Sequence, residues 1–229
     1  MKAYTKYAII VSGGTGSRMD SALPKQFLEL KGLPVLMHSM AAFSKREDIK
    51  IVLVLNKEHE HIWKALCLKH RFYTAHTIVY GGENRFQSVN NGLEFIKSIE
   101  PDLSKILIAV HDGVRPLVDQ NTITNGFDAA AVYGSAVPTV KSKDSVRVMD
   151  ESGQSKALNR DFVLLVQTPQ IFKADILATG YHQDYKDSFT DDASVIEKSG
   201  YPIHLVEGNI RNIKITYPID LKIAEMWIV

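Results

Sequence analysis

Residues 7–26 read YAIIVSGGTGSRMDSALPKQ, and this stretch indicates both a fold and a class of ligand. The short apolar run from Tyr7 to Val11 ends at a glycine cluster, which is the pattern of a buried strand leading into a loop. Glycines let the backbone come close to an anion, so that successive N–H groups can point at it. Arg18 and Lys25 flank the cluster and add two cations. We therefore expect a site for a ligand that carries several phosphates.

The glycine cluster differs from two well-known phosphate loops. The P-loop pattern needs a lysine and a serine or threonine directly after its last glycine, whereas here Lys25 comes nine residues after Gly16. The dinucleotide-binding pattern G-x-G-x-x-G is absent as well. An ordinary strand-to-helix turn is the alternative interpretation of the glycines taken alone.

Size and composition narrow the class of protein. The chain has 229 residues, 45% of them hydrophobic and 23% charged, which fits one large α/β domain or two small ones. Its net charge of +1 argues against a nucleic-acid-binding surface. The single cysteine, Cys67, excludes an internal disulfide and fits a reducing compartment. With neither a signal peptide nor an apolar run of about 18 residues, we expect a cytoplasmic protein without a membrane partner.

Strands and helices are predicted to alternate along the first half of the chain. Apolar runs predict strands at 7–11, 51–55, 76–79 and 106–110, and helical spacing predicts helices over 34–46, 58–70 and 83–99. This order favours an α/β fold with a Rossmann-like open, mostly parallel twisted sheet and flanking helices. Ligands of such sheets bind beyond the carboxyl ends of the strands. The glycine cluster, Gly81-Gly82 and His111-Asp112 all follow predicted strands and should meet there.

Residues 139–166 break this alternation. The stretches SVRVM (145–149) and FVLLV (162–166) surround the turn-rich ESGQ, which predicts an antiparallel excursion or a projecting β-arm. An arm needs a surface to pack on, and a second subunit is one candidate. A helix from Lys173, a capped helix within 190–200, strands at 203–206 and 212–216, and a helix from Pro218 complete the chain. We expect one domain over residues 1–229, with 139–166 as its arm.

Several residues at these strand ends suit nucleotide chemistry. Asp112 can hold a divalent metal or a ribose hydroxyl, whereas His111 is better explained as a packing residue. Arg85 and Ser88 lie near a helix start, where anions or a carbonyl oxygen of a base are favoured. Lys214 alternates with Ile213 and Ile215, so it either lines the crevice or extends along a sheet edge. At least one of Asp191 and Asp192 is expected to cap a helix.

A cationic, glycine-lined crevice without a recognisable nucleophile suits phosphoryl or nucleotidyl transfer. In such reactions the protein mainly positions the reactants and offsets developing charge. The residues alone therefore indicate a nucleotide-binding α/β protein that acts as a transferase.

Seven segments, in order, resemble the 2-C-methyl-D-erythritol 4-phosphate cytidylyltransferase family. They are SGGTGSRM…LPKQFL, GGENRFQSV, VHDGVRPLV, DSVR, QTPQIF, TDDASVIE and VEGNIRNIKIT. The resemblance implies a homodimer that exchanges its β-arms. It also implies that the phosphate of methylerythritol 4-phosphate attacks the α-phosphorus of CTP, with Mg²⁺ on the triphosphate and pyrophosphate as the leaving group.

The resemblance also assigns roles to individual positions. Arg18, Lys25, Arg160 and Lys214 match the catalytic positions of the family. The CTP-binding positions are Ser12, Gly13, Gly14, Thr15, Gly16, Gly82, Arg85, Ser88 and Asp112, with Asp112 as the candidate metal ligand. Arg115, Ser145 and Thr190 match positions that contact the sugar-alcohol phosphate. Ser12 stands where the family usually has alanine, and the stretch before Ser145 is about two residues longer than usual.

Two other functions are compatible with parts of the sequence. Ribitol-5-phosphate cytidylyltransferases share the glycine loop and PKQFL, although TDDASVIE favours methylerythritol phosphate as the acceptor. A non-catalytic nucleotide-binding protein is the second alternative. The joint presence of Arg18, Lys25, Arg160 and Lys214 argues against it.

Overall fold

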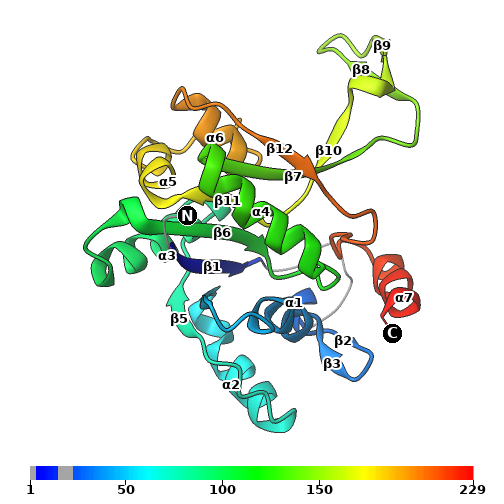
Figure 1. Ribbon diagram of the computed structural model, residues 1–229. Helices are drawn as coiled ribbons and strands as arrows, with labels where there is room; N and C mark the ends of the chain where they lie inside the picture. Colours follow the sequence, from blue (N-terminus) through cyan, green and yellow to red (C-terminus); the bar gives the residue numbers. More distant parts are fainter. Residues whose placement is uncertain (1–3, 15–22, 229) are drawn as a thin grey trace.

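A mixed sheet of eight strands runs through the protein, which the computed structural model describes over residues 4–14 and 23–228. Four strands are mutually parallel: β1 (Thr5–Ser12), β4 (Ile49–Leu55), β5 (Thr77–Tyr80) and β6 (Ile106–Asp112). The others are β7 (Ser135–Lys141), β10 (Leu164–Val166), β11 (Gln170–Lys173) and β12 (Leu205–Glu207). The strand order is β10-β7-β11-β6-β1-β4-β5, and β12 pairs with β7 (Figure 1). The prediction of an open, mostly parallel sheet is confirmed.

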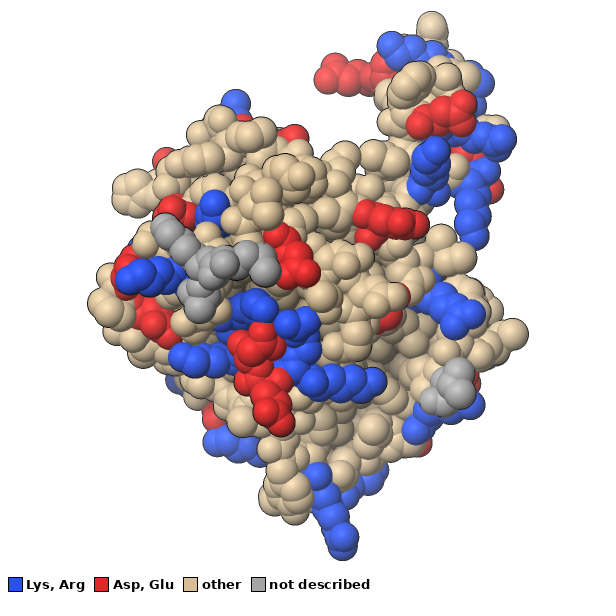
Figure 2. All heavy atoms as spheres, viewed as in Figure 1, with Lys and Arg blue, Asp and Glu red and all other residues tan. Residues whose placement is uncertain are grey.

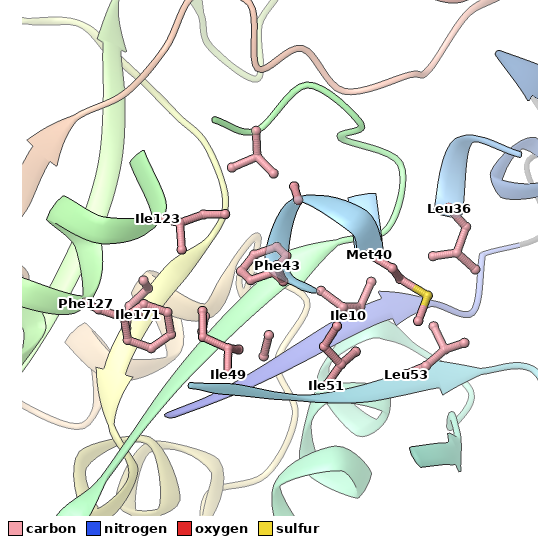
Figure 3. Packing of buried hydrophobic residues seen from close by; sticks show 14 of the residues in the cluster. Ile10, Leu36, Met40, Phe43, Ile49, Ile51, Leu53, Ile123, Phe127 and Ile171 are labelled. Carbon is pink, nitrogen blue, oxygen red and sulfur yellow. The ribbon is translucent and has the colours of Figure 1, made fainter. Parts of the chain in front are cut away.

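Helices cover both faces of this sheet. One face packs against α1 (Val35–Ser44), α2 (Glu60–Lys69) and α4 (Gln120–Tyr133), and the other against α3 (Arg85–Ile99), α5 (Ala174–Tyr181) and α6 (Asp192–Lys198). In β1, Ile10 faces the first layer and Ile9 the second, so the strand is buried on both sides. Figure 3 shows Ile10 on the side of Met40 and Phe43 of α1. No helix in the described part of the chain is long and apolar enough to cross a membrane.

Several shorter elements complete the fold. They are the 3₁₀ helices η2 (Lys25–Phe27), η3 (Lys57–His59), η4 (Leu103–Lys105) and η5 (Arg160–Phe162), the pair β2 (Glu29–Leu30) and β3 (Leu33–Pro34), and the last helix α7 (Pro218–Trp227). A small core that includes Leu30, Val35 and Ala224 joins α7 to the β2–β3 pair. Figure 1 shows this helix beside β2 and β3.

The path of the chain through the sheet sets the position of the site. From β1 the chain moves outward through β4 to β5, and then returns past β1 to β6 on its other side. Such a reversal of strand order leaves a crevice at the carboxyl ends of the two strands beside it. Ser12 ends β1 and Asp112 ends β6, so both residues lie at this crevice.

The predicted arm is present, but its pairing differs from the expectation. A hairpin of β8 (Val146–Met149) and β9 (Ser155–Leu158) stands away from the main sheet (Figure 1). Residues 155–158 were not predicted as a strand, and they, rather than the FVLLV segment, pair with β8. Within that segment β10 pairs antiparallel with β7 in the main sheet. The free hairpin is therefore shorter than residues 139–166, and the expectation of a single domain over 1–229 stays a prediction.

Other differences have local causes. Residues 212–216 form no strand, because Ile213 and Ile215 alternate to pack into the small core beside α7 rather than to pair with a neighbour. The helix α4 and the strand β11 were not predicted. The expectation that one of Asp191 and Asp192 caps a helix is confirmed, because α6 begins after Asp191, whose carboxylate accepts the N–H of Ser194.

Gly92 is a point of close contact between α3 and the sheet. A β-carbon added there would lie 3.0 Å from methyl groups of both Ile9 and Val54. We expect Gly92→Leu to lower the free energy of unfolding by about 2–3 kcal/mol, because neither strand side chain can move aside without disturbing the core. Urea denaturation measures the change, with Ser98→Leu on the exposed side of the same helix as the control. Equal stability of the two variants would contradict this packing.

Candidate functional site

A cavity of about 230 Å³ lies at the carboxyl ends of β1 and β6. It brings together nine residues that the sequence placed at the site: Ser12, Gly13, Gly14, Lys25, Gly82, Arg85, Ser88, Asp112 and Lys214. These residues come from four separate parts of the chain. The expectation that the strand ends meet at one crevice is therefore correct.

A second cavity of about 240 Å³ adjoins the first and shares Arg85, Asp112 and Lys214 with it. Arg115 and Thr190 line this second cavity. The two cavities thus separate the predicted residues into a group around the glycines and a group around the candidate acceptor contacts. Asp112 and Lys214 lie where the two groups meet.

The loop after β5 is closed by the first turn of α3. Asn84 caps the helix by accepting the N–H of Gln87, and the Ser88 hydroxyl donates to the Asn84 carbonyl at 2.8 Å. The Gly82 N–H in turn donates to Ser88 Oγ at 3.2 Å. A β-carbon at Gly82 would lie 2.4 Å from Gln87 Cβ, so only glycine fits there. Ser88 thus fixes the backbone that forms one wall of the cavity.

Asp112 is the centre of an ion-pair cluster. One carboxylate oxygen lies 3.0 Å from Lys214 Nζ and 3.5 Å from Arg115 Nε, and the other lies 3.4 Å from Arg85 Nε. Burial of Asp112 would raise its pKa, but the charges of Arg85, Lys214 and Arg115 outweigh burial and hold the pKa well below its usual range. Asp112 is therefore ionised, and Lys214 lies in the crevice rather than along a sheet edge.

The donor set at Asp112 is compatible with Mg²⁺ bound together with phosphates. Among the described residues no group of three or more His, Cys, Asp or Glu side chains could hold a metal. Mg²⁺ commonly binds through one or two carboxylates, several waters and the phosphates of a substrate. Asp112 can supply one carboxylate facing the cavity, so it fits a substrate-bridged metal and not an all-protein site.

Arg85 is held by a second buried carboxylate that the sequence analysis did not assign to the site. Its guanidinium donates to both oxygens of Asp192, at 2.9 and 2.6 Å, and the Tyr181 hydroxyl donates to Asp192 at 2.6 Å. Burial lowers the pKa of Arg85, but the two aspartates more than reverse this and raise it well above its usual value. The only signal in the sequence was the Asp191-Asp192 pair, of which one residue caps a helix and the other is left for another partner.

His111 and Arg115 form hydrogen bonds that hold the end of β6 in place. Arg115 donates to the backbone carbonyl of Asn212 at 2.9 Å, which ties the segment that carries Lys214 to the strand end. His111 is fully buried, with Nε2 3.2 Å from the Arg115 carbonyl and Nδ1 3.1 Å from the Thr168 hydroxyl oxygen. A carbonyl can only accept, so Nε2 carries the proton and Nδ1 accepts from Thr168. His111 is a packing residue, as expected.

Some predicted residues lie elsewhere. Thr15, Gly16 and Arg18 fall outside the residues that the structure describes. Ser145 and Arg160 are exposed on the arm, where the Arg160 guanidinium donates to the Lys143 carbonyl at 3.2 Å. Neither of them lines the two cavities of this chain. Figure 2 shows the arm standing clear of the body, with side chains of both charge signs on it.

Gln26 is a further residue of the site that the sequence analysis did not single out. Its side chain is 1% exposed, lines the first cavity, and donates from Nε2 to the carbonyls of Ser12 and Gly14. The sequence marks it only by its position directly after Lys25.

Comparison with known proteins places this architecture in one family. The sequence profile of the 2-C-methyl-D-erythritol 4-phosphate cytidylyltransferases matches residues 7–229. The enzyme of that name from Bacteroides fragilis is 47% identical over 218 residues, which cover 95% of this chain and 96% of the relative. The one from Clostridium novyi is 38% identical, covering 95% and 94%.

Solved structures agree with this result. The 4-diphosphocytidyl-2C-methyl-D-erythritol synthase of Anaerococcus prevotii superimposes with a TM-score of 0.81 at 28% identity, covering 98% of this chain and 96% of the other. The 2-C-methyl-D-erythritol 4-phosphate cytidylyltransferase of Thermus thermophilus gives a TM-score of 0.75 at 28% identity, covering 98% of each chain.

The buried imidazole of His111 makes stability depend on pH. Burial lowers the pKa of His111 to about 4, whereas in the unfolded chain it is about 6.5. Between these values the unfolded chain binds a proton that the folded chain does not, so the free energy of unfolding falls as the pH drops from 6.5 to 4. We expect His111 to contribute about 2 kcal/mol to the loss of stability between pH 7 and pH 5.

Urea denaturation at pH 7 and pH 5 tests this expectation. His111→Gln should lose less stability than the wild type on acidification, even if it is less stable at both pH values. The exposed His182, changed to Gln, is the control and should keep the wild-type pH dependence. An unchanged pH dependence in His111→Gln would show that His111 is not the group responsible.

Proposed function

The chain belongs to the 2-C-methyl-D-erythritol 4-phosphate cytidylyltransferase family, and we propose that it joins CTP to 2-C-methyl-D-erythritol 4-phosphate. The products are 4-diphosphocytidyl-2-C-methyl-D-erythritol and pyrophosphate, in non-mevalonate isoprenoid biosynthesis. The observation that carries the proposal is the family match over residues 7–229. The crevice supports it, because glycines, Lys25, Asp112 and Lys214 face one cavity at the strand ends.

The chemistry is a displacement at phosphorus. A phosphate oxygen of the acceptor forms a bond to the α-phosphorus of CTP, and the bond from that phosphorus to the bridging oxygen of pyrophosphate breaks. No proton transfer is needed, because the attacking phosphate is already an anion. The protein's task is to hold two anions together and to stabilise the charge that grows on the α-phosphate oxygens.

The residues of this chain divide between the two substrates. Lys25 lines the cavity with Gly13 and Gly14, on the side proposed for the triphosphate, and Arg18 is proposed to act beside it. Lys214 lies between the two cavities, where it can draw the acceptor phosphate toward the α-phosphorus. Arg115 and Thr190 are proposed to contact the acceptor. Fixed cations act strongly in a crevice that is partly shielded from water.

Mg²⁺ is proposed as the cofactor, with Asp112 as its protein ligand. When bound, the ion would offset negative charge on the triphosphate. The charge of Asp112 is balanced by Lys214, Arg85 and Arg115. Lys214 lines both cavities beside Asp112, so a phosphate of either substrate could contact it.

We further propose a homodimer in which the arm of each chain reaches the site of its partner. Arg160 and Ser145 lie outside the cavities of their own chain, yet both match functional positions of the family. The arm also carries large exposed apolar side chains, among them Met149, Leu158 and Phe162, which is unusual for a surface that meets only water. A cytoplasmic location is part of the proposal, since the single cysteine needs no oxidising compartment.

The acceptor can be tested directly by pyrophosphate release. We expect turnover with CTP, Mg²⁺ and 2-C-methyl-D-erythritol 4-phosphate, and little or none with ribitol 5-phosphate under the same conditions. Removing the metal with EDTA should abolish turnover, and added Mg²⁺ should restore it. Turnover with ribitol 5-phosphate alone would reject the proposed acceptor, and absence of any CTP-dependent turnover would reject the enzyme class.

Mixed dimers test whether the site is shared between chains. Lys25→Ala and Arg160→Ala should each lower kcat by on the order of 100-fold, because each removes a cation from the reacting phosphates. Co-expressed with different tags and purified as a mixed dimer, the two variants should recover part of the activity, since one of the two sites then carries neither change. Arg160→Ala should be compared with Lys156→Ala, another exposed arm cation. Lack of recovery in a verified mixed dimer would place both residues in the site of one chain.

A further inference from the structure

Gln26 connects the glycine loop to the segment that carries Lys25. Its side-chain nitrogen lies 3.1 Å from the carbonyl oxygen of Ser12 and 3.2 Å from that of Gly14. Carbonyl oxygens can only accept hydrogen bonds, so the part of the Gln26 amide that contacts both of them is its NH₂ group. The side chain is 1% exposed, so water cannot replace these bonds readily.

These two hydrogen bonds fix the direction of the loop carbonyls. Carbonyl oxygens carry partial negative charge and would repel a phosphate if they faced it. Bound to Gln26, the oxygens of Ser12 and Gly14 are turned toward that amide. In a planar trans peptide the N–H points opposite to the C=O, so the N–H of Gly13 is turned away from Gln26. On the side away from Gln26 the loop therefore presents the Gly13 N–H, a donor, rather than the two carbonyl oxygens.

The segment around Gln26 is itself rigidly held. Pro24 fixes the backbone just before Lys25, and its carbonyl accepts the N–H of Phe27 at 2.8 Å. Phe27 is 2% exposed and packs against the rings of Trp63 and His59. Lys25 thus lies between a fixed turn and a buried anchor, while the next residue binds the glycine loop. The cation and the loop are held as one unit.

We propose that Gln26 is a positioning residue that locks Lys25 and the glycine loop into one anion-binding unit and thereby sets the affinity for the triphosphate of CTP. The proposal rests on the proposed function for the identity of its ligand. The link between Gln26 and the loop stands independently of that ligand.

Gln26→Met tests the proposal, because methionine has a similar length but no donor. Titration calorimetry with CTP and Mg²⁺ should show about tenfold weaker binding, the effect of losing two bonds that orient the loop. In steady-state kinetics the KM for CTP should rise, and the KM for the acceptor should stay within twofold of wild type. Gln26→Glu has nearly the same shape but places a carboxylate against two carbonyls, so its affinity should fall further.

Gln183 provides a matched control. Its amide also donates to two backbone carbonyls, those of Gly180 and Val195, and in addition to the Ser199 hydroxyl, but it lies outside both cavities. Gln183→Met should lower the melting temperature about as much as Gln26→Met and leave CTP affinity unchanged. If Gln183→Met weakened CTP binding equally, the effect would be one of general stability and the proposal would be wrong.

Amide hydrogen exchange without ligand separates this proposal from the proposed function. Exchange of residues 12–14 should be about tenfold faster in Gln26→Met than in wild type, and unchanged in Gln183→Met. Unchanged exchange, or CTP affinity within twofold of wild type, would overturn the role of Gln26. If Gln26→Met does not fold, Gln26→Asn, which keeps the amide but is one methylene shorter, gives the same comparison. Failure of the wild-type protein to bind CTP would contradict the proposed function, and the exchange result would still decide the role of Gln26.

Discussion

The carboxylate of Asp112 holds three cations from three separate parts of the chain. Arg85 comes from α3, Arg115 from the turn after β6, and Lys214 from the segment before α7. Without this charge, three like charges would repel one another in a crevice that is partly shielded from water. The carboxylate of Asp112 holds the three cations in position before any ligand binds. A site that must bind two anions therefore depends on a buried anion of its own, and on a second, Asp192, that orients Arg85.

The apolar pattern of the sequence predicted the strands that are buried on both faces of the sheet. The strands β1, β4 and β6 are aliphatic because helices cover both of their faces, so their sequences carry the signal directly. The helix α4 has few large apolar side chains, and β11 is short and is placed by pairing with β6 and β7, which are distant in sequence. Residues 212–216 were predicted as a strand because apolar and polar residues alternate there. The alternation instead reflects packing into the small core and not strand pairing.

The candidate site was predictable wherever a residue follows a strand or alternates with apolar neighbours. Asp112 and Lys214 are examples, and they lie 3.0 Å apart. Asp192 and Gln26 were not predictable, because their partners are set by tertiary structure. Asp192 meets a guanidinium from a helix more than a hundred residues earlier, and Gln26 binds backbone atoms that carry no sequence signal. The residues that hold a site in place are less visible in a sequence than those that face its ligand.

The two halves of the site differ in how they are held. On the side of the glycines, Gln26 and the buried Phe27 connect the loop to Lys25 within one short stretch of chain. On the other side, Lys214 is fixed by Asp112, and the cations of the arm stand outside both cavities. The hairpin β8–β9 pairs only within itself among the described strands, so its own chain does little to fix its position. A rigid half suits the substrate that binds first, and under the proposed dimer the other half would be completed by the arm of the partner chain.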